Sequence, residues 1–273
     1  MPVTISPSGE WQQLRGLEID CERESARIIA FIQAEMARAG FGRAVVGLSG
    51  GVDSSLVAML SVRALGADNV LAMIMPYETS NPESEAHARL MIEATGMRHD
   101  RFDITPLVKP FLAHDPAMDA RRQGNVMARC RMIVLYDQSA AFDGLVMGTS
   151  NRTETLLGYF TLHGDGAAGI KPIAHLYKCQ VRALARHLGV PEEIISKAPS
   201  ADLWASQTDE GELGFTYDEA DQILYLLTEC NLSAEEIATL GFDIIVIKAI
   251  QKRMEATAFK RQPPPSLWRR KSR

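Results

Sequence analysis

Apolar residues follow two recurring patterns along the first two thirds of the chain. Short, nearly continuous apolar runs are typical of parallel strands covered on both faces; we expect strands at 44–48, 69–76, 99–104 and 144–148. Longer segments repeat apolar positions every three or four residues, which predicts helices; these lie at 19–39, 52–60, 84–96, 125–143 and 176–188. Strands that alternate with helices predict an α/β fold, a doubly wound parallel sheet with helices on both faces.

The remaining segments break this alternation. A proline-containing loop is expected after residue 104, and the stretches 159–172 and 198–214 are too irregular for a helix or strand. Long irregular stretches in compact domains are often functional loops. Residues 217–259 have helical periodicity and predict a helical C-terminal part, and from Lys260 an extended tail with three consecutive prolines is expected.

Composition narrows the class of protein. The chain has 273 residues, of which 46% are hydrophobic, and no repeat or linker divides it, so residues 1–273 are expected to form one domain. A net charge of −5 and a pI near 5.7 argue against nucleic acid as the main partner. No apolar run approaches the ~20 residues of a membrane span, and the N-terminus lacks the pattern of a signal peptide.

The four cysteines, Cys21, Cys130, Cys179 and Cys230, lie far apart and contain no C-x-x-C pair. Neither a zinc site nor a disulfide framework is therefore indicated. A cytoplasmic enzyme is the simplest class that fits.

The strongest chemical signal is the segment VVGLSGGVDSS at 45–55. A buried strand breaks at 49–51, and a helical pattern starts at Val52, so backbone N–H groups and a helix N-terminus are aimed at one point that suits a phosphate. Glycine permits the close approach, because a Cβ would collide with phosphate oxygens. Asp53 is suited to hold a magnesium ion beside the phosphates. The alternative is an ordinary strand-to-helix turn in which Ser and Asp only cap the helix.

The strand at 144–148 repeats this arrangement. It ends in Thr149-Ser150-Asn151 and delivers hydroxyl and amide side chains to the same edge of the sheet. Because ligands of open parallel sheets bind at the carboxyl ends of the strands, both strand ends are expected to meet one ligand.

The string SGGVDS at 49–54 resembles the pyrophosphate loop of the N-type ATP pyrophosphatase superfamily and lacks the lysine of the G-x-x-x-x-G-K-[ST] loop. Five further strings follow in the order of the ammonia-dependent NAD synthetases: NVMARCRM, GTSNRTETLLGYFT, GDG, LYKCQV and PSADLWASQTDEGELG. The chain resembles this family over most of its length. The resemblance implies an adenine nucleotide alpha hydrolase-like fold and a ligase that converts deamido-NAD, ATP and ammonia into NAD, AMP and pyrophosphate through an adenylated carboxylate.

The resemblance also implies roles for individual positions. The expected ATP-binding residues are Gly47, Leu48, Ser49, Gly50, Gly51, Val52, Asp53, Ser54, Thr149, Lys178 and Ser200. Asp53 and Lys178 are the expected catalytic residues, and Asp53 and Glu154 the expected Mg²⁺ ligands. The acid substrate is expected at Arg129, Leu162, Gly169, Phe259 and Lys260. Taken singly, Glu154 reads equally as a first-turn helix charge, Lys178 as a solvated lysine and Ser200 as a loop cap.

Three positions depart from the family pattern, all on the side of the acid substrate. Leu162 stands where the family has a lysine, Gly169 where it has an aspartate and Phe259 where it has a histidine. One lost charge-assisted hydrogen bond costs about 1.5–3 kcal/mol, on the order of 10–150-fold in affinity. A NAD synthetase with a rearranged acid site is favoured, and the alternative is a related ligase that amidates a different, less charged carboxylic acid.

Other classes fit less well. A tRNA-modifying or sulfur-transferring enzyme would need a basic RNA-binding region and an active cysteine near the loop, and neither is evident. A paralogue that only binds nucleotide is disfavoured because both Asp53 and Glu154 are present. The chain has no room for a glutaminase domain, so free ammonia or a separate partner is the expected nitrogen source. The family implies a homodimer, with 125–143 as the expected contact, and backbone groups near 73–77 are expected to bind adenine.

Overall fold

The computed structural model describes residues 15–198 and 209–267. Its four-stranded sheet is parallel throughout, in the order β3-β2-β1-β4. The strands are β1 (Arg43–Gly47), β2 (Val70–Ile74), β3 (Arg98–Arg101) and β4 (Gly144–Met147). The chain moves outward from β1 to β3 and then returns to the other side of β1. The carboxyl ends of β1 and β4 therefore form the switch point, where open parallel sheets bind their ligands.

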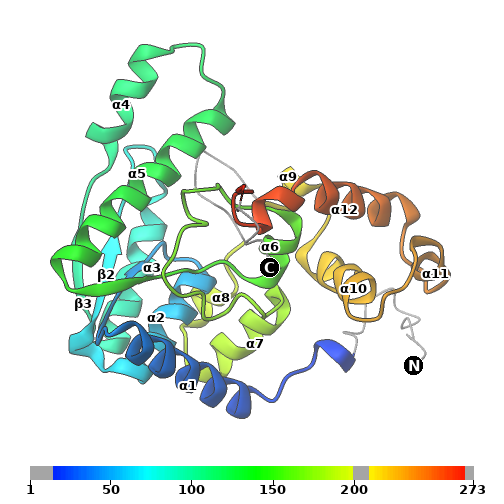
Figure 1. The fold of residues 1–273 in the computed structure, drawn as a ribbon, viewed down its shortest axis with the longest axis horizontal. Helices are drawn as coiled ribbons and strands as arrows, with labels where there is room; N and C mark the ends of the chain where they lie inside the picture. Colours follow the sequence, from blue (N-terminus) through cyan, green and yellow to red (C-terminus); the bar gives the residue numbers. More distant parts are fainter. Residues whose placement is uncertain (1–14, 199–208, 268–273) are drawn as a thin grey trace, which may run out of the picture.

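Helices cover both faces of the sheet, which confirms the predicted α/β class (Figure 1). Ala44 and Val46 of β1 belong to the buried cluster under α1, α2 and α7, whereas Val45 between them packs toward α4 and α5. These residues alternate because successive side chains of a strand point to opposite faces. The helices of this part are α1 (Cys21–Ala39), α2 (Val52–Leu65), α3 (Pro82–Thr95), α4 (Thr105–His114), α5 (Ala120–Ala141), α7 (Lys178–Leu188) and α8 (Glu192–Ile195).

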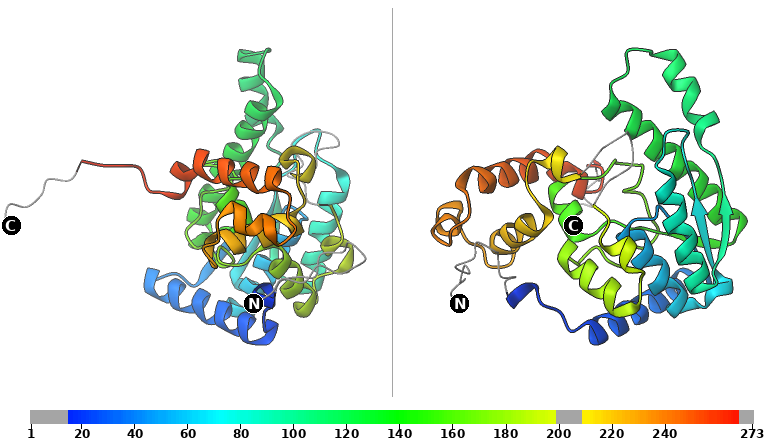
Figure 2. Two further views of the ribbon diagram at one scale, coloured as in Figure 1. Left: turned by 90° about the vertical axis from the view of Figure 1, so that its right-hand side faces the viewer. Right: turned by 180° about the vertical axis from the view of Figure 1, so that it is seen from behind.

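A separate buried cluster lies among the C-terminal helices, which stand beside the sheet-bearing part (Figures 1 and 2). It includes Leu157, Phe215, Ile223, Ile237 and Ile247, all buried. The helices around it are α6 (Arg152–Leu157), α9 (Asp209–Leu213), α10 (Tyr217–Thr228), α11 (Ala234–Thr239) and α12 (Ile244–Ala256). The 3₁₀ turns among the described residues are η1 (Arg15–Leu17), η2 (Ala67–Asn69) and η3 (Ala258–Arg261).

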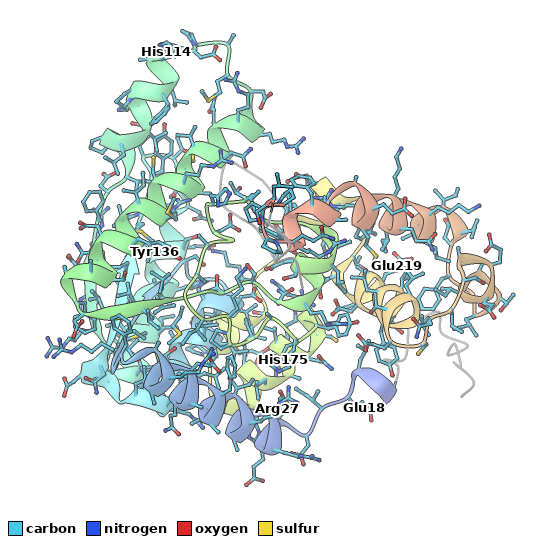
Figure 3. All side chains as sticks on the ribbon, viewed as in Figure 1. Glu18, Arg27, His114, Tyr136, His175 and Glu219 are labelled. Carbon is cyan, nitrogen blue, oxygen red and sulfur yellow. The ribbon has the colours of Figure 1, made fainter. Side chains whose placement is uncertain are left out.

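Local caps explain where several helices begin and end. Asp20 begins α1 because its carboxylate accepts a hydrogen bond from Arg23 N at 3.0 Å, and Gly40 ends it in the left-handed conformation at φ 78°. Asp119 begins α5 in the same way, accepting from Arg122 N at 2.8 Å. His175 Nε2 lies 2.6 Å from Glu24 Oε1, so the segment before α7 is tied to α1 (Figure 3).

Three local predictions were wrong, and two short helices, α6 and α8, were not predicted. The expected loop after residue 104 is α4, because Pro106 lies in its first turn, where no intrahelical N–H bond is due, and Val108 packs against the core despite Pro110. Helix α9 lies inside a stretch expected to be irregular. Lys260 belongs to η3 rather than to an extended tail.

Within the described part of the chain, no helix combines the length and the apolar character that crossing a membrane requires.

Candidate active site

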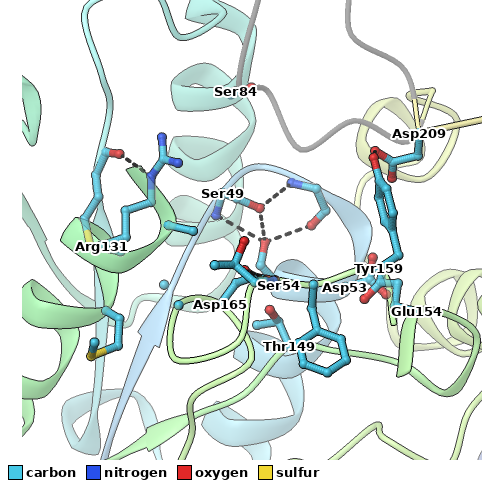
Figure 4. Close-up of a pocket in the computed structure, with 18 of the residues that line it drawn as sticks. Ser49, Asp53, Ser54, Ser84, Arg131, Thr149, Glu154, Tyr159, Asp165 and Asp209 are labelled. Atoms are coloured by element: carbon cyan, nitrogen blue, oxygen red, sulfur yellow. Dashed lines mark hydrogen bonds between the residues drawn. The ribbon is translucent and has the colours of Figure 1, made fainter. Parts of the chain in front are cut away.

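The loop between β1 and α2 is held in shape by its own serine side chains. Ser54 Oγ accepts a hydrogen bond from Ser49 N at 3.2 Å, donates to Gly51 O at 2.9 Å, and lies 3.0 Å from Ser49 Oγ. Ser49 Oγ in turn accepts from Gly51 N at 3.3 Å. Figure 4 shows this serine pair at the end of β1. The loop is therefore a preformed turn at a helix N-terminus, which is the geometry that binds phosphate.

The two glycines of this loop meet different constraints. Gly50 has φ +78°, and a Cβ on it would lie 2.2 Å from Ser84 O in the first turn of α3, so packing inside the protein already requires glycine. Gly51 has φ −91°, and the nearest atom to an added Cβ would be Ser49 Oγ at 3.5 Å. Only a ligand that approaches the backbone would require glycine at this second position.

Asn151 connects the ends of β1 and β4. Its Oδ1 accepts from Glu154 N at 2.9 Å while Glu154 Oε2 accepts from Asn151 N at 3.3 Å, a capping box that begins α6. Its Nδ2 donates to Asp53 Oδ1 at 2.8 Å. This buried amide therefore fixes the Asp53 and Glu154 carboxylates on the same side of the loop.

Lys178, the first residue of α7, reaches both carboxylates. Its Nζ lies 2.5 Å from Asp53 Oδ2 and 3.3 Å from Glu154 Oε1, and only 4% of the side chain is exposed. The face of the Tyr217 ring, from α10, lies 4.9 Å from the same Nζ. The three residues expected to carry the chemistry on the ATP side therefore form one buried ionic cluster.

Burial and neighbouring charges shift the pKa of Glu154 and the pKa of Lys178. Burial, followed by the Asp53 carboxylate, raises the pKa of Glu154 to about 8, and Lys178 acts in the opposite direction. Burial by itself would lower the pKa of Lys178, but the two carboxylates outweigh it and raise that pKa above the ordinary value for lysine. Lys178 is therefore charged at neutral pH. An added cation would stabilise the two neighbouring carboxylates in their charged form.

The two carboxylates of the cluster suit Mg²⁺ better than they suit an ion that is coordinated by protein ligands alone. Mg²⁺ prefers oxygen ligands and is usually held by one or two carboxylates together with waters and substrate phosphates. Asp53 and Glu154 supply two carboxylates beside the phosphate loop. Among residues 15–198 and 209–267, no group of three or more His, Cys, Asp or Glu side chains is arranged to hold a metal. A Mg²⁺ ion that arrives with nucleotide phosphates therefore suits this pair.

A third carboxylate, that of Asp209 in α9, faces the same cluster (Figure 4). Its Oδ1 accepts from Tyr159 OH and its Oδ2 from Tyr217 OH, each at 3.1 Å. Tyr159 OH also lies 2.9 Å from Glu212 Oε2, so its single proton is shared between the two carboxylates. Burial raises the pKa of Asp209, opposed first by Lys178. The two phenols join α9, α10 and the segment after α6 around the lysine.

On the expected acid side, cations hold the backbone of the segment 158–162. Lys260 Nζ donates to Gly158 O at 2.8 Å and to Phe160 O at 2.7 Å. An Arg129 N–H donates to Leu162 O at 3.3 Å. Burial lowers the pKa of Lys260, and the charges of Arg121 and Arg253 lower it further. Four cations thus line this end of the cavity, which suits an anionic substrate.

One cavity of about 1680 Å³ connects both sides. Its lining includes these expected residues: Gly47, Leu48, Ser49, Gly51, Val52, Asp53, Ser54, Thr149, Glu154, Lys178, Arg129, Leu162, Phe259 and Lys260. Gly50 and Gly169 do not line it; Gly169 N instead donates to Val146 O at 2.9 Å beside β4. Ser200 lies outside the described residues. Residues 73–77 do line the cavity, and Arg131 Nε donates to Met75 O there at 3.0 Å.

Sequence reasoning placed Asn151 at this edge of the sheet but gave it no role in the site, and it missed Asp209 and Lys197. The role of Asn151 was detectable, because N-R-T-E at 151–154 is a capping-box signature that predicts a helix start. Asp209 had no such signal, because Tyr159 lies 50 residues earlier in the chain and the nearer partner, Tyr217, belongs to a different helix, α10. Lys197 lines the phosphate side of the cavity and donates to Ser84 Oγ at 3.1 Å, and nothing in its local sequence marks it.

The chain is similar to known proteins over most of its length. A family model described as NAD synthase matches residues 24–264. The NH(3)-dependent NAD(+) synthetase of Trichlorobacter lovleyi is 48% identical over 248 residues, which cover 91% of each chain. Among solved structures, an NMN synthetase from Francisella tularensis has a TM-score of 0.82 at 31% identity, covering 92% of this chain and 99% of that one. The NH3-dependent NAD synthetase from Campylobacter jejuni, solved with a nitrate ion, has a TM-score of 0.79 at 33% identity and coverages of 92% and 100%.

Proposed function

Because the chain belongs to the NAD synthase family, we propose that it amidates deamido-NAD with ammonia and splits ATP into AMP and pyrophosphate. The observation that carries the proposal is the Lys178 ammonium between Asp53 and Glu154, beside a preformed phosphate loop. A carboxylate and ammonia alone form only a salt. The carboxylate must first gain a leaving group, and an adenylate supplies one.

In the first step, a carboxylate oxygen of the acid attacks the α-phosphorus of ATP. The new O–P bond forms while the bond from phosphorus to the bridging oxygen of pyrophosphate breaks. Negative charge then develops on the phosphoryl oxygens and on the leaving group. The backbone N–H groups of residues 52–54 in the first turn of α2 and the Lys178 ammonium, fixed in place before the reaction, stabilise that charge. Magnesium held by Asp53 and Glu154 would neutralise the phosphates.

In the second step, ammonia attacks the carbonyl carbon of the adenylate. The C–O bond to AMP breaks, AMP leaves with the bonding electrons, and the nitrogen loses one proton. The segment 158–162, held by Arg129 and Lys260, is our proposed wall for the acid during this step. Exclusion of bulk water by this wall protects the adenylate from hydrolysis.

The acid itself has a second candidate. One structural neighbour is named an NMN synthetase, and Leu162 and Phe259 bring apolar side chains to the cavity, which suits a less charged acid. Against this, the curated relatives at 46–49% identity are named NAD(+) synthetases. We therefore favour the dinucleotide and keep a mononucleotide as the alternative.

The test supplies the purified protein with Mg-ATP and an ammonium salt, in parallel with deamido-NAD and with the deamido form of nicotinamide mononucleotide. We expect NAD and pyrophosphate in equal amounts, and a higher kcat/KM for the dinucleotide. A higher kcat/KM for the mononucleotide would show that the mononucleotide, not the dinucleotide, is the substrate. Release of pyrophosphate without any acid would refute the proposed ligase activity.

We also propose that the protein is a homodimer that contacts its second copy through α5. Ile133 and Tyr136 support this, because they are 57% and 41% exposed one turn apart on that helix. Figure 3 labels Tyr136 on α5. An Ile133→Asp variant should shift the mass in light-scattering chromatography to that of a single chain. A cytoplasmic location is proposed as well, supported by four cysteines that are all free thiols.

A further inference from the structure

Asp221 of α10 is a fully buried carboxylate that lies behind the ionic cluster, outside the cavity lining. Its Oδ1 accepts a hydrogen bond from Thr153 Oγ1 at 2.5 Å, and its Oδ2 accepts from Cys179 N at 2.7 Å. Thr153 precedes Glu154, and Cys179 follows Lys178. The carboxylate therefore binds the chain neighbours of two members of the cluster, one in α6 and one in α7.

The first turn of α7 depends on these contacts. The first N–H groups of a helix have no partner within the helix, and Tyr177, the residue before α7, makes no side-chain cap bond to it. Instead, Lys178 N donates to Thr153 Oγ1 at 3.0 Å and Cys179 N donates to Asp221. The helix that carries Lys178 is thus capped by side chains from α6 and α10.

The donors and acceptors in this network have fixed directions. A backbone N–H can only donate, so Thr153 Oγ1 accepts from Lys178 N and gives its own proton to Asp221. The carboxylate therefore accepts both of these hydrogen bonds, and the Cys179 side chain also bonds to it; an ionised carboxylate satisfies all of these donors. Asparagine has one acceptor oxygen and one NH₂ group, so in either orientation one of the two donors would face an NH₂.

We propose that Asp221 is a positioning residue for the reaction, which holds the N-terminus of α7 against α6 so that Lys178 and Glu154 meet at Asp53. Tyr217, one turn earlier on α10, lies against the Lys178 ammonium, so a single helix face supports both the backbone and the side chain of the lysine. A misplacement of about 1 Å at a reacting group can cost on the order of 100-fold in rate. The inference rests on the proposed ligase function for its kinetic readout.

The experiment compares Asp221→Asn with Asp243→Ala by kcat, KM for ATP and melting temperature. Asp243 caps α12 by accepting from Ile245 N at 2.8 Å, so its loss removes a helix cap of similar size away from the cluster. We expect Asp221→Asn to lower kcat about 10–100-fold with little change in KM for ATP, and Asp243→Ala to keep kcat. Wild-type kcat in Asp221→Asn, or an equal loss in Asp243→Ala, would overturn the proposal.

A second pair keeps the test decisive if Asp221→Asn does not fold. Thr153→Val removes the relaying hydroxyl at nearly constant volume, and Thr153→Ser restores it; we expect a loss of kcat only in the valine variant. Hydrogen exchange of the peptide that spans 177–181 needs no activity and should accelerate in Thr153→Val alone. Equal exchange and equal kcat in the two variants would refute positioning, whereas a wild-type protein that forms no amide product would refute the proposed function separately.

Discussion

The ammonium nitrogen of Lys178 lies 2.5 Å from Oδ2 of Asp53, although 125 residues separate them in the chain. Asp53 stands in the first turn of α2 and Lys178 is the first residue of α7, and both helices pack in one buried cluster. Two helix N-termini, each with a partial positive charge, therefore converge where phosphate charge is expected. This convergence makes the lysine central to the predictions that follow.

Lys178→Met should nearly abolish activity. Removal of one preorganised donor typically lowers kcat about 10²–10³-fold, and here the partly buried carboxylates of Asp53 and Glu154 also lose their shared cation. The melting temperature should fall as well, because removal of one partner from a buried ion pair costs about 3–5 kcal/mol. Steady-state kinetics and thermal unfolding measure the two effects. The exposed Lys248→Met is the matched control, and a kcat within tenfold of wild type in Lys178→Met would contradict the prediction.

Glu154→Gln should alter how stability depends on pH in the absence of Mg²⁺ and ATP. The pKa of Glu154 is about 8 in the folded protein and near 4.5 in the unfolded chain, so the folded state holds the proton more tightly between these values. This contribution is fully present below pH 4.5 and is lost as the pH rises through about 8.

Melting temperatures at pH 5, 7 and 9 test this sign. The wild-type protein should lose stability relative to Glu154→Gln as pH rises, and a change of about 1 kcal/mol would move the melting temperature by about 2–4 °C. Parallel curves for the two proteins would show that Glu154 keeps an ordinary pKa.

Substitution of the two loop glycines by alanine should affect two different properties, the stability of the fold at Gly50 and the affinity for ATP at Gly51. Gly50→Ala should destabilise the fold by about 1 kcal/mol or more, because φ is +78° and the new Cβ meets Ser84 O. Gly51→Ala has room in the ligand-free loop, so its melting temperature should stay near wild type while its affinity for ATP falls. Thermal unfolding and ATP titration of both variants decide the matter. Normal ATP affinity in Gly51→Ala would mean that phosphate does not approach this residue.

Lys260→Met should weaken binding of the acid substrate without changing the binding of ATP. The ammonium donates to two carbonyls of the proposed acid wall, at Gly158 and Phe160. Loss of such charged hydrogen bonds costs about 1.5–3 kcal/mol, so we expect KM for the acid to rise at least about 10-fold. The exposed Lys252→Met on α12 is the control, and an equal rise in KM for ATP would show a general disturbance instead.

The sequence predicted the phosphate side of the site because the features there are local. Strand, glycine turn and helix follow one another within 45–55, and the hydrophobic period identifies each of them. The acid side depends on contacts that no local pattern encodes. Lys260 reaches Gly158 across 102 residues, and Asp209 receives Tyr159 across 50. Gly169 shows the same limit. The motif gave only its position in the sequence, whereas in the structure its backbone bonds to Val146 of β4 and it does not line the cavity.

The C-terminal turn η3 has a consequence for the order in which the protein is made. Lys260 and Arg261 bind back to the carbonyls of Gly158, Phe160 and Leu156, about a hundred residues earlier. On the ribosome, β1 and its loop emerge before these two cations, so the contacts that the cations make with the segment 156–160 can form only after η3 has emerged. The residues of the nucleotide half are therefore all synthesised before Lys260 of the acid half. A nascent chain that stops short of η3 would present a phosphate loop with no finished place for the acid.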